Sequence, residues 1–317
     1  MKCLPRASRS SLTGFDIKQF SMATILLFGA GGQLGREISS RAARFALSIR
    51  ALTRAQLNIT DSFAVEAAIR ACAPSVVINA AAYTDVDAAE SQPEKAFSVN
   101  GRGLHVIGSA CSAQEIPIIH ISSDYVFDGS RQCSYDECAP VAPLNVYGRS
   151  KAAGEELLRI SNKQHIILRT SWLYGTHGNS FLQKIVSLLE KRDEICVVSD
   201  QIGCPTNTID VADAILKLSL VLQKKTRIWG TFHFAGPTSI SRYGFACQIA
   251  NILEQYNGRR VAVLPVTSAE FSAPALRPHN STLDCSRFYD TFGFRAEPLE
   301  KRLKQTIAHL FSGDKLI

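Results

Sequence analysis

The sequence contains no hydrophobic run that approaches the roughly 18–20 apolar residues that a membrane-spanning helix needs. The first 21 residues are basic and rich in serine, but they lack the apolar core of a secretory signal. Met22 is the only methionine besides the first, and it stands directly before an apolar segment. We therefore interpret residues 1–22 as a disordered leader or a mis-assigned start, and we expect a soluble, cytoplasmic protein without a membrane partner.

The nine cysteines include no CxxC pair and no Cys/His spacing typical of a zinc site. Their odd number and scattered positions favour free thiols in a reducing compartment. A strongly basic surface is missing as well, because about +3 of the formal net charge of +7 belongs to residues 1–22 and the remainder forms no stripe. We therefore expect no protein-bound metal and no nucleic-acid partner.

Short apolar segments alternate with helical patterns along the first half of the chain. The strand-like segments cover residues 24–28, 47–52, 75–82, 116–123 and 165–172. Such alternation predicts an α/β fold with a Rossmann-type, doubly wound parallel sheet. We expect an NAD(P)-binding domain over residues 23–175, to which residues 205–235 return, and mainly a smaller substrate-binding lobe over residues 176–317.

A glycine-rich loop follows the first predicted strand. Gly29, Gly32 and Gly35 form a GxxGxxG pattern that opens a helix, and this arrangement lets backbone N–H groups approach a pyrophosphate. The spacing resembles that of the short-chain dehydrogenase/reductase superfamily. The sequence therefore predicts a dinucleotide cofactor.

The choice of cofactor depends on the end of the second strand. An acidic residue there would bind the free ribose of NADH, but Thr53 and Arg54 occupy this region. Because a guanidinium pairs well with a phosphate, we predict that NADPH is preferred, with NADH still possible. The small side chains Ala80, Ala81 and Ala82 would let the cofactor pass closely.

Tyr147 and Lys151 lie four residues apart, which places them on one helix face, one turn apart. An ammonium group beside a tyrosine lowers its pKa from the ordinary value near 10, so that it can exchange protons. Ser123 ends the fourth strand, at the edge where sheets of this class bind ligands. We predict that its hydroxyl binds the reacting oxygen while Tyr147 transfers the proton.

Seven segments carry a more specific resemblance: LFGAGGQLG, NAAAYTDVDAAE, SSDYVFDG, PLNVYGRSKAAGE, RTSWLYG, DQIGCPT and RPHNSTLD. In this order they resemble the dTDP-4-dehydrorhamnose reductase family, from about residue 23 to the C-terminus. The resemblance implies reduction of dTDP-4-dehydro-L-rhamnose at C4, giving dTDP-L-rhamnose for cell-surface polysaccharide. It also implies a dTDP-sugar partner, a monomer or homodimer, and association with other enzymes of this pathway.

The resemblance assigns roles to residues by position. Ser123, Tyr147 and Lys151 would be catalytic, with Ser123 standing where many members have threonine. Asp124 and Trp172 would contact the sugar nucleotide. The cofactor contacts that it implies are Gly32, Gln33, Leu34, Ala80, Ala81 and Ala82. Arg277 is a further candidate for the substrate, because its guanidinium suits the nucleotide diphosphate.

Some positions depart from the family pattern. Asn58 replaces an aspartate near the expected adenine pocket. Some members are dimers bridged by Mg²⁺ through glutamates; Glu37 matches one of these, but Ile209 and His309 stand at the others. We therefore expect no metal-bridged dimer.

Two alternatives stay open. The chain could be a reductase or epimerase for another 4-keto-6-deoxy sugar nucleotide, whereas a dehydratase would need Glu where Tyr125 follows Asp124. It could also be a non-catalytic NADP-binding subunit like the β subunit of methionine adenosyltransferase, which shares SSDYVFDG and a YGxxK segment. His120 and His233 are interpreted as packed core histidines.

Overall fold

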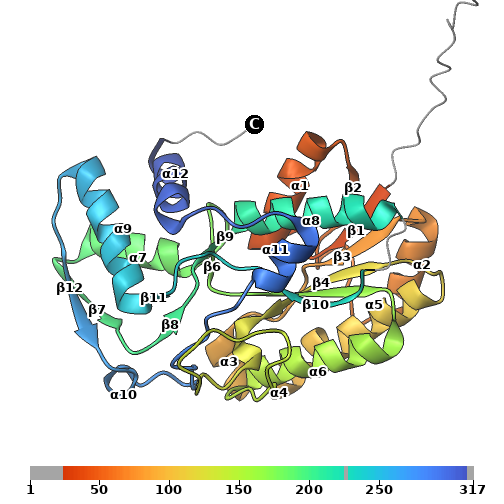
Figure 1. Cartoon of the computed structure of the whole chain (residues 1–317), viewed down its shortest axis with the longest axis horizontal. Helices are drawn as coiled ribbons and strands as arrows, with labels where there is room; N and C mark the ends of the chain where they lie inside the picture. The colour runs from red at the N-terminus through yellow and green to blue at the C-terminus, as the bar shows by residue number, and fades with distance from the viewer. Residues whose placement is uncertain (1–23, 225–227, 313–317) are drawn as a thin grey trace, which may run out of the picture.

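The computed structural model describes residues 24–224 and 228–312, and Figure 1 shows a sheet covered by helices beside a smaller lobe. The leader or mis-assigned start that the sequence suggested lies outside the described residues. Within them, no helix combines the length and hydrophobicity of a membrane span.

The larger part is built on a six-stranded sheet with the order β10-β5-β4-β3-β1-β2, and every neighbouring pair is parallel. Its strands are β1 (Thr24–Phe28), β2 (Ser48–Leu52), β3 (Val76–Asn79), β4 (Ile118–Ser123), β5 (His165–Thr170) and β10 (Gly230–His233). The β3 strand is buried along its whole length, which explains its continuous apolar run. The predicted fold class is confirmed.

Helices cover both faces of this sheet (Figure 1). On one face α1 (Gln33–Arg41) and α8 (Thr208–Gln223) pack together, and their side chains share a core with one side of β1 and β3. On the other face lie α2 (Ser62–Cys72), α5 (Gly103–Ser112) and α6 (Val146–Ser161), packed on the alternate side chains of the same strands.

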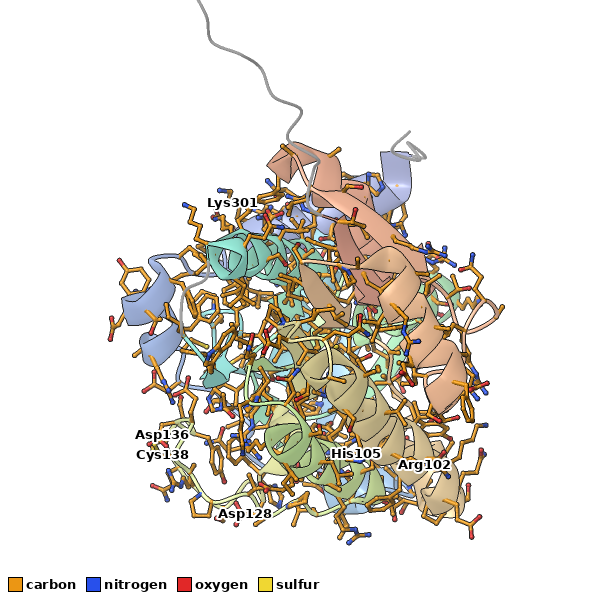
Figure 2. The ribbon with its side chains drawn as sticks, turned by 90° about the vertical axis from the view of Figure 1, so that its right-hand side faces the viewer. Arg102, His105, Asp128, Asp136, Cys138 and Lys301 are labelled. Carbon is orange, nitrogen blue, oxygen red and sulfur yellow. The ribbon has the colours of Figure 1, made fainter. Side chains whose placement is uncertain are left out.

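Shorter elements complete the second face. These are α3 (Val86–Ser91), α4 (Pro93–Phe97), a π-helical turn η2 (Ser98–Arg102) and the 3-10 turn η3 (Asp124–Val126) after β4; the 3-10 helix η1 (Ala42–Phe45) follows α1. Figure 2 views the molecule from the side and labels Arg102 and His105, which are exposed on the outer surface of this layer.

The smaller lobe has its own apolar core. It is formed by α7 (Phe181–Lys191), β7 (Glu194–Val198), α9 (Arg242–Asn257), β12 (Ala262–Val266) and α12 (Leu299–Ser312). Strands β7 and β12 pair in parallel. The helix α10 (Ser268–Phe271) follows β12, and α11 (Ser286–Phe292) packs on β10.

Two very short strand pairs connect this lobe to the sheet. The β6 strand (Leu173–Tyr174) pairs with β9 (Thr206–Asn207), and β8 (Ile202–Gly203) pairs with β11 (Ile240–Ser241). Each strand has two residues, so no alternating pattern announces it in the sequence. The first pair fixes the segment after β5 against the segment that begins α8, and the second fixes the segment after β7 against the segment that begins α9.

The strand order brings the loop after β1 and the loop after β3 side by side at the carboxyl ends of the strands. The chain moves outward from β1 to β2 and then returns to β3 on the other side of β1. Ligands of doubly wound sheets bind where the order reverses in this way, beyond the carboxyl ends of the strands. Here that position lies between the glycine loop after β1 and the alanines after β3.

Candidate active site

The glycine loop packs directly against the segment after β3. Gly29 has a φ of +85°, and a Cβ on it would lie 2.4 Å from the backbone nitrogen of Ala81. A Cβ on Gly35 would lie 2.1 Å from the carbonyl oxygen of Gly29. Both positions therefore require glycine, because any side chain would push the loop away from the sheet.

A cavity of about 400 Å³ opens beside this loop. Its lining includes Gly29, Gly31, Gly32, Thr53, Arg54, Asn58, Ala80, Ala81, Ala82 and Tyr83. The structure thus brings the glycine loop, the arginine after β2 and the alanines after β3 around one space. An elongated ligand with phosphate groups suits this lining, because it offers a helix N-terminus and a guanidinium.

Among the residues that the resemblance assigned to the cofactor, Leu34 and Gln33 do not line this cavity. Leu34 is 6% exposed and belongs to the apolar core beneath α1. Gln33 lies against Gly178 at the start of the second lobe, and its buried Nε2 has no hydrogen-bond partner among the described residues. Their role as cofactor contacts stays a prediction.

The end of β4 forms the centre of the candidate site. Ser123 ends the strand, and its Oγ accepts a hydrogen bond from the Tyr125 N–H at 3.2 Å and donates one to Asp124 Oδ1 at 3.0 Å. Ser171 Oγ donates to Asp124 Oδ2 at 2.9 Å. Asp124 is buried, and burial raises its pKa although these hydroxyls oppose the change. Asp124 therefore organises the hydroxyls around it.

The helix α6, which carries Tyr147 and Lys151, begins against this turn. Asn145 caps the helix through a hydrogen bond from the Gly148 N–H to its Oδ1 at 2.7 Å. A Cβ on Gly148 would lie 2.1 Å from the carbonyl oxygen of Tyr125, so the first turn of α6 touches the backbone after Ser123. This contact brings Tyr147 beside Ser123.

Burial raises the pKa of Tyr147, and a hydrogen bond with the Ser123 side chain opposes the rise only in part. This direction is opposite to the lowering that we expected from a neighbouring ammonium. The physical reason is that Lys151 Nζ lies elsewhere: it contacts the carbonyl oxygen of Ile121 at 2.7 Å and His120 Nε2 at 3.1 Å. Ser123 and Tyr147 are thus brought together, while Lys151 lies one turn below them.

Lys151 is 2% exposed, and burial lowers its pKa to about 8, with the charge of Glu155 opposing. Glu155 is itself fully buried and accepts hydrogen bonds from Arg169 Nε at 2.9 Å and from Arg169 Nη2 at 2.6 Å. Burial alone would raise the pKa of Glu155, but this guanidinium holds it below the usual value. Glu155 is therefore a carboxylate that anchors α6 to β5.

Trp172 directly follows Ser171, whose hydroxyl binds Asp124. Its φ is +45°, which is uncommon for a large residue, and a Cβ on Gly203 would lie 2.3 Å from its indole ring. The guanidinium of Arg242 lies 3.5 Å from the indole centroid. The indole is thus held between Gly203 and Arg242, while its buried Nε1 has no hydrogen-bond partner among the described residues.

Arginines gather around the Tyr125 side chain. Both Arg242 and Arg277 hydrogen bond to it. Arg277 also donates to Asp87 Oδ2 at 2.7 Å. This bond links α3 to the segment just before Asn280, which bridges to Ile202 of β8. The sequence pattern made Arg277 a candidate for the substrate but gave no signal for Arg242, which is the first residue of α9. Two guanidiniums at the Tyr125 side chain, one of which also acts on Asp124, favour an anionic ligand.

The chain matches the family model described as RmlD substrate binding domain over residues 22–312. It is 36% identical over 281 residues to the dTDP-4-dehydrorhamnose reductase of Sinorhizobium fredii, covering 88% of this chain and 95% of that protein. It is 38% identical to the protein of the same name from Aggregatibacter actinomycetemcomitans, over 91% of this chain and 99% of that one.

Several solved structures are similar to this chain over most of its length. A dTDP-4-dehydrorhamnose reductase from Clostridium acetobutylicum superposes with a TM-score of 0.85 at 36% identity, covering 90% of this chain and 99% of that one. The Bacillus anthracis enzyme of the same name, solved in complex with NADP, gives 0.84 at 34% identity, with the same coverage of both chains. A UDP-glucose 4-epimerase from Thermus thermophilus, at 18% identity and a TM-score of 0.75, shares the fold.

Proposed function

The chain belongs to the RmlD substrate binding domain family, and we propose that it reduces the C4 ketone of dTDP-4-dehydro-L-rhamnose to dTDP-L-rhamnose with NADPH. The observation that carries the proposal is the contact of Ser123 with Tyr147 at the carboxyl end of β4. This pair lies at the sheet edge where a ligand of a doubly wound fold binds. The names of the relatives supply the substrate class.

The proposed cofactor is NADPH, held in the cavity beside the glycine loop. Gly29, Gly32 and Gly35 leave room for a pyrophosphate against the N-terminus of α1. Arg54 would pair with the 2′-phosphate, because it lines the same cavity after β2. Replacing Arg54 with serine should weaken NADPH binding and leave NADH binding little changed, and titration of both cofactors measures the ratio.

The bound cofactor would supply the hydride. Tyr147 donates its proton to the ketone oxygen, and its raised pKa keeps the phenol protonated at neutral pH, as a proton donor requires. Ser123 donates a hydrogen bond to the same oxygen and orients it toward Tyr147. Lys151 would hold the nicotinamide ribose and assist Tyr147 from the next turn of α6.

Asp124, Trp172 and Arg277 are the proposed substrate contacts, and the structure adds Arg242 to them. The guanidiniums of Arg242 and Arg277 converge on Tyr125, which suits the diphosphate of a dTDP-sugar. The indole of Trp172 would form a wall against the sugar. An Arg277→Ala variant with an unchanged KM for the sugar nucleotide would remove this residue from the proposal.

We further propose that the protein acts in the cytoplasm as a monomer or homodimer, and that it associates with other enzymes of the pathway. The described residues include no group of His, Cys, Asp and Glu side chains able to hold a metal ion. The reaction as written needs only the side chains named above and the nicotinamide cofactor.

The decisive experiment uses the 4-keto sugar nucleotide produced in situ by the upstream dehydratase and epimerase. NADPH oxidation that requires the epimerase would establish the L-rhamnose product. Oxidation without the epimerase would assign another isomer. A folded protein that binds NADPH but oxidises none with either preparation would refute the enzyme and favour a regulatory subunit.

A further inference from the structure

A buried histidine lies directly behind Lys151. His120 is 1% exposed and sits in β4, between Asn79 at the end of β3 and Lys151 on α6. Its Nδ1 lies 3.2 Å from Asn79 Nδ2, and its Nε2 lies 3.1 Å from Lys151 Nζ. The proposed reaction gives this histidine no role, yet it contacts one of the proposed catalytic side chains.

The hydrogen bonds fix the direction of this chain of contacts. The Ala81 backbone N–H, which can only donate, points at Asn79 Oδ1 at 3.1 Å. The other end of the amide must therefore be the NH₂ group, and it faces His120 Nδ1. Because an amide NH₂ also only donates, Nδ1 accepts in this contact, although the Asn79 backbone forms a hydrogen bond with His120 as well. The proton of the neutral imidazole is then on Nε2.

That proton points at Lys151. An ammonium group offers three donors and no acceptor, whereas a neutral amine has a lone pair. The contact of His120 Nε2–H with Nζ therefore matches a neutral Lys151. One N–H of the amine donates to the carbonyl oxygen of Ile121 at 2.7 Å.

The surroundings bring the neutral amine within reach, and it predominates above about pH 8. Burial lowers the pKa of Lys151 to about 8, and burial together with Lys151 lowers the pKa of His120 well below its usual value. Glu155 on α6 is the charged group that acts on Lys151, and Tyr147 lies one turn before the lysine on the same helix. The charge of Glu155 favours the ammonium, but Arg169 of β5 largely neutralises it.

We propose that Asn79 and His120 form a tautomer lock that holds Lys151 Nζ against β4 as a hydrogen-bond acceptor and sets how readily this lysine takes up a proton. His120 is thus a positioning residue. Protonation adds one proton from solvent to Nζ and removes its lone pair, so the ammonium has to leave Nε2–H and turn toward Tyr147. The link to catalysis rests on the proposed function; the lock itself does not.

The first test is the ¹⁵N NMR spectrum of the histidine rings in the whole protein, with His120 assigned by the loss of its signals in His120→Gln. The expected result is an unprotonated Nδ1 and a protonated Nε2 in His120 at every pH from about 6 to 9. A proton on Nδ1, or a titration near the ordinary histidine pKa, would overturn the proposal.

The second test is Asn79→Asp. A carboxylate accepts from both the Ala81 N–H and His120 Nδ1–H, so the ring changes tautomer and Nε2 becomes an acceptor for the ammonium. The pKa of Lys151, followed by the ¹³C shift of its Cε, should then rise from about 8 to above roughly 9. An unchanged value would show that the lock does not control the lysine.

A matched control is Asn162→Asp. Asn162 is 2% exposed and accepts through Oδ1 from the backbone N–H two residues on, as Asn79 does, but it lies at the end of α6, three turns from Lys151. This control should leave the pKa of Lys151 unchanged. Neither spectroscopic test uses a sugar substrate, so the proposal fails or stands separately from the reductase activity, and the wild-type spectrum decides it even if Asn79→Asp does not fold.

Discussion

Glu155→Gln is the substitution whose cost follows most directly from the structure. Glu155 is fully buried and accepts four hydrogen bonds: one from Ser122 at 2.6 Å, two from Arg169 at 2.9 and 2.6 Å, and one from Arg159 at 2.8 Å. A glutamine keeps the shape of the side chain but loses its charge and one acceptor oxygen. Whichever way the amide turns, one N–H of Arg169 faces an NH₂ group.

The size of the loss in unfolding free energy depends on Arg169, which is 2% exposed and cannot reach water. Breaking a buried ion pair while leaving the other charge in place costs about 3–5 kcal/mol. Arg159 is 30% exposed and can be solvated, so it adds little. We therefore expect Glu155→Gln to lower the free energy of unfolding by about 3–5 kcal/mol, measured by urea unfolding at pH 7.

The neighbouring residue provides a matched control. Glu156 is 70% exposed and, within residues 24–224 and 228–312, pairs only with Arg159, so Glu156→Gln should change the free energy of unfolding by less than about 1 kcal/mol. A second readout separates a local from a general effect: because the charge of Glu155 raises the pKa of Lys151, its removal should lower that pKa further below about 8. Equal losses in the two variants would refute the reasoning.

Three further outcomes are expected. Gly203→Ala should raise the KM for the sugar nucleotide at least about tenfold without changing NADPH affinity, because the new Cβ would lie 2.3 Å from the Trp172 indole; equal KM values in steady-state assays would contradict this. Gly35→Ala should weaken NADPH binding by a similar factor in a fluorescence titration, since its Cβ would lie 2.1 Å from the Gly29 carbonyl oxygen; unchanged affinity would count against the loop as the cofactor site. Burial lowers the pKa of His233 to about 4, so only the unfolded chain takes up this proton as the pH falls below 6.5. Stability should therefore decrease toward pH 4 by up to about 1.4 kcal/mol per pH unit from this group, and the slope should flatten in His233→Gln.

Local patterns made the sheet and the proximity of Ser123 and Tyr147 predictable. Continuous apolar runs such as residues 24–28 mark strands buried on both faces, and the glycines after them mark a tight turn. The spacing of Tyr147 and Lys151 is a property of one helix, so it needs no tertiary information. Ser123 could be placed with them because the carboxyl ends of parallel strands share one edge of the sheet.

Contacts between distant segments could not be predicted in this way. Arg242 reaches Trp172 only because β8 and β11 pair, and strands of two residues leave no periodic signal. The direction of the Tyr147 pKa was wrong because burial, which sequence spacing does not reveal, outweighs the other influences. His120 was interpreted as core packing because its contact with Lys151 depends on how α6 lies across β4.

The central claim is that Tyr147, supported by Ser123, donates the proton during NADPH-dependent reduction. The most direct measurement is a single turnover with excess enzyme, following the absorbance of reduced nicotinamide in the wild type and in Tyr147→Phe after NADPH binding has been shown for both. The account predicts that the variant binds NADPH and is slower by about 10²–10⁴-fold. A variant that oxidises NADPH at the wild-type rate would contradict it.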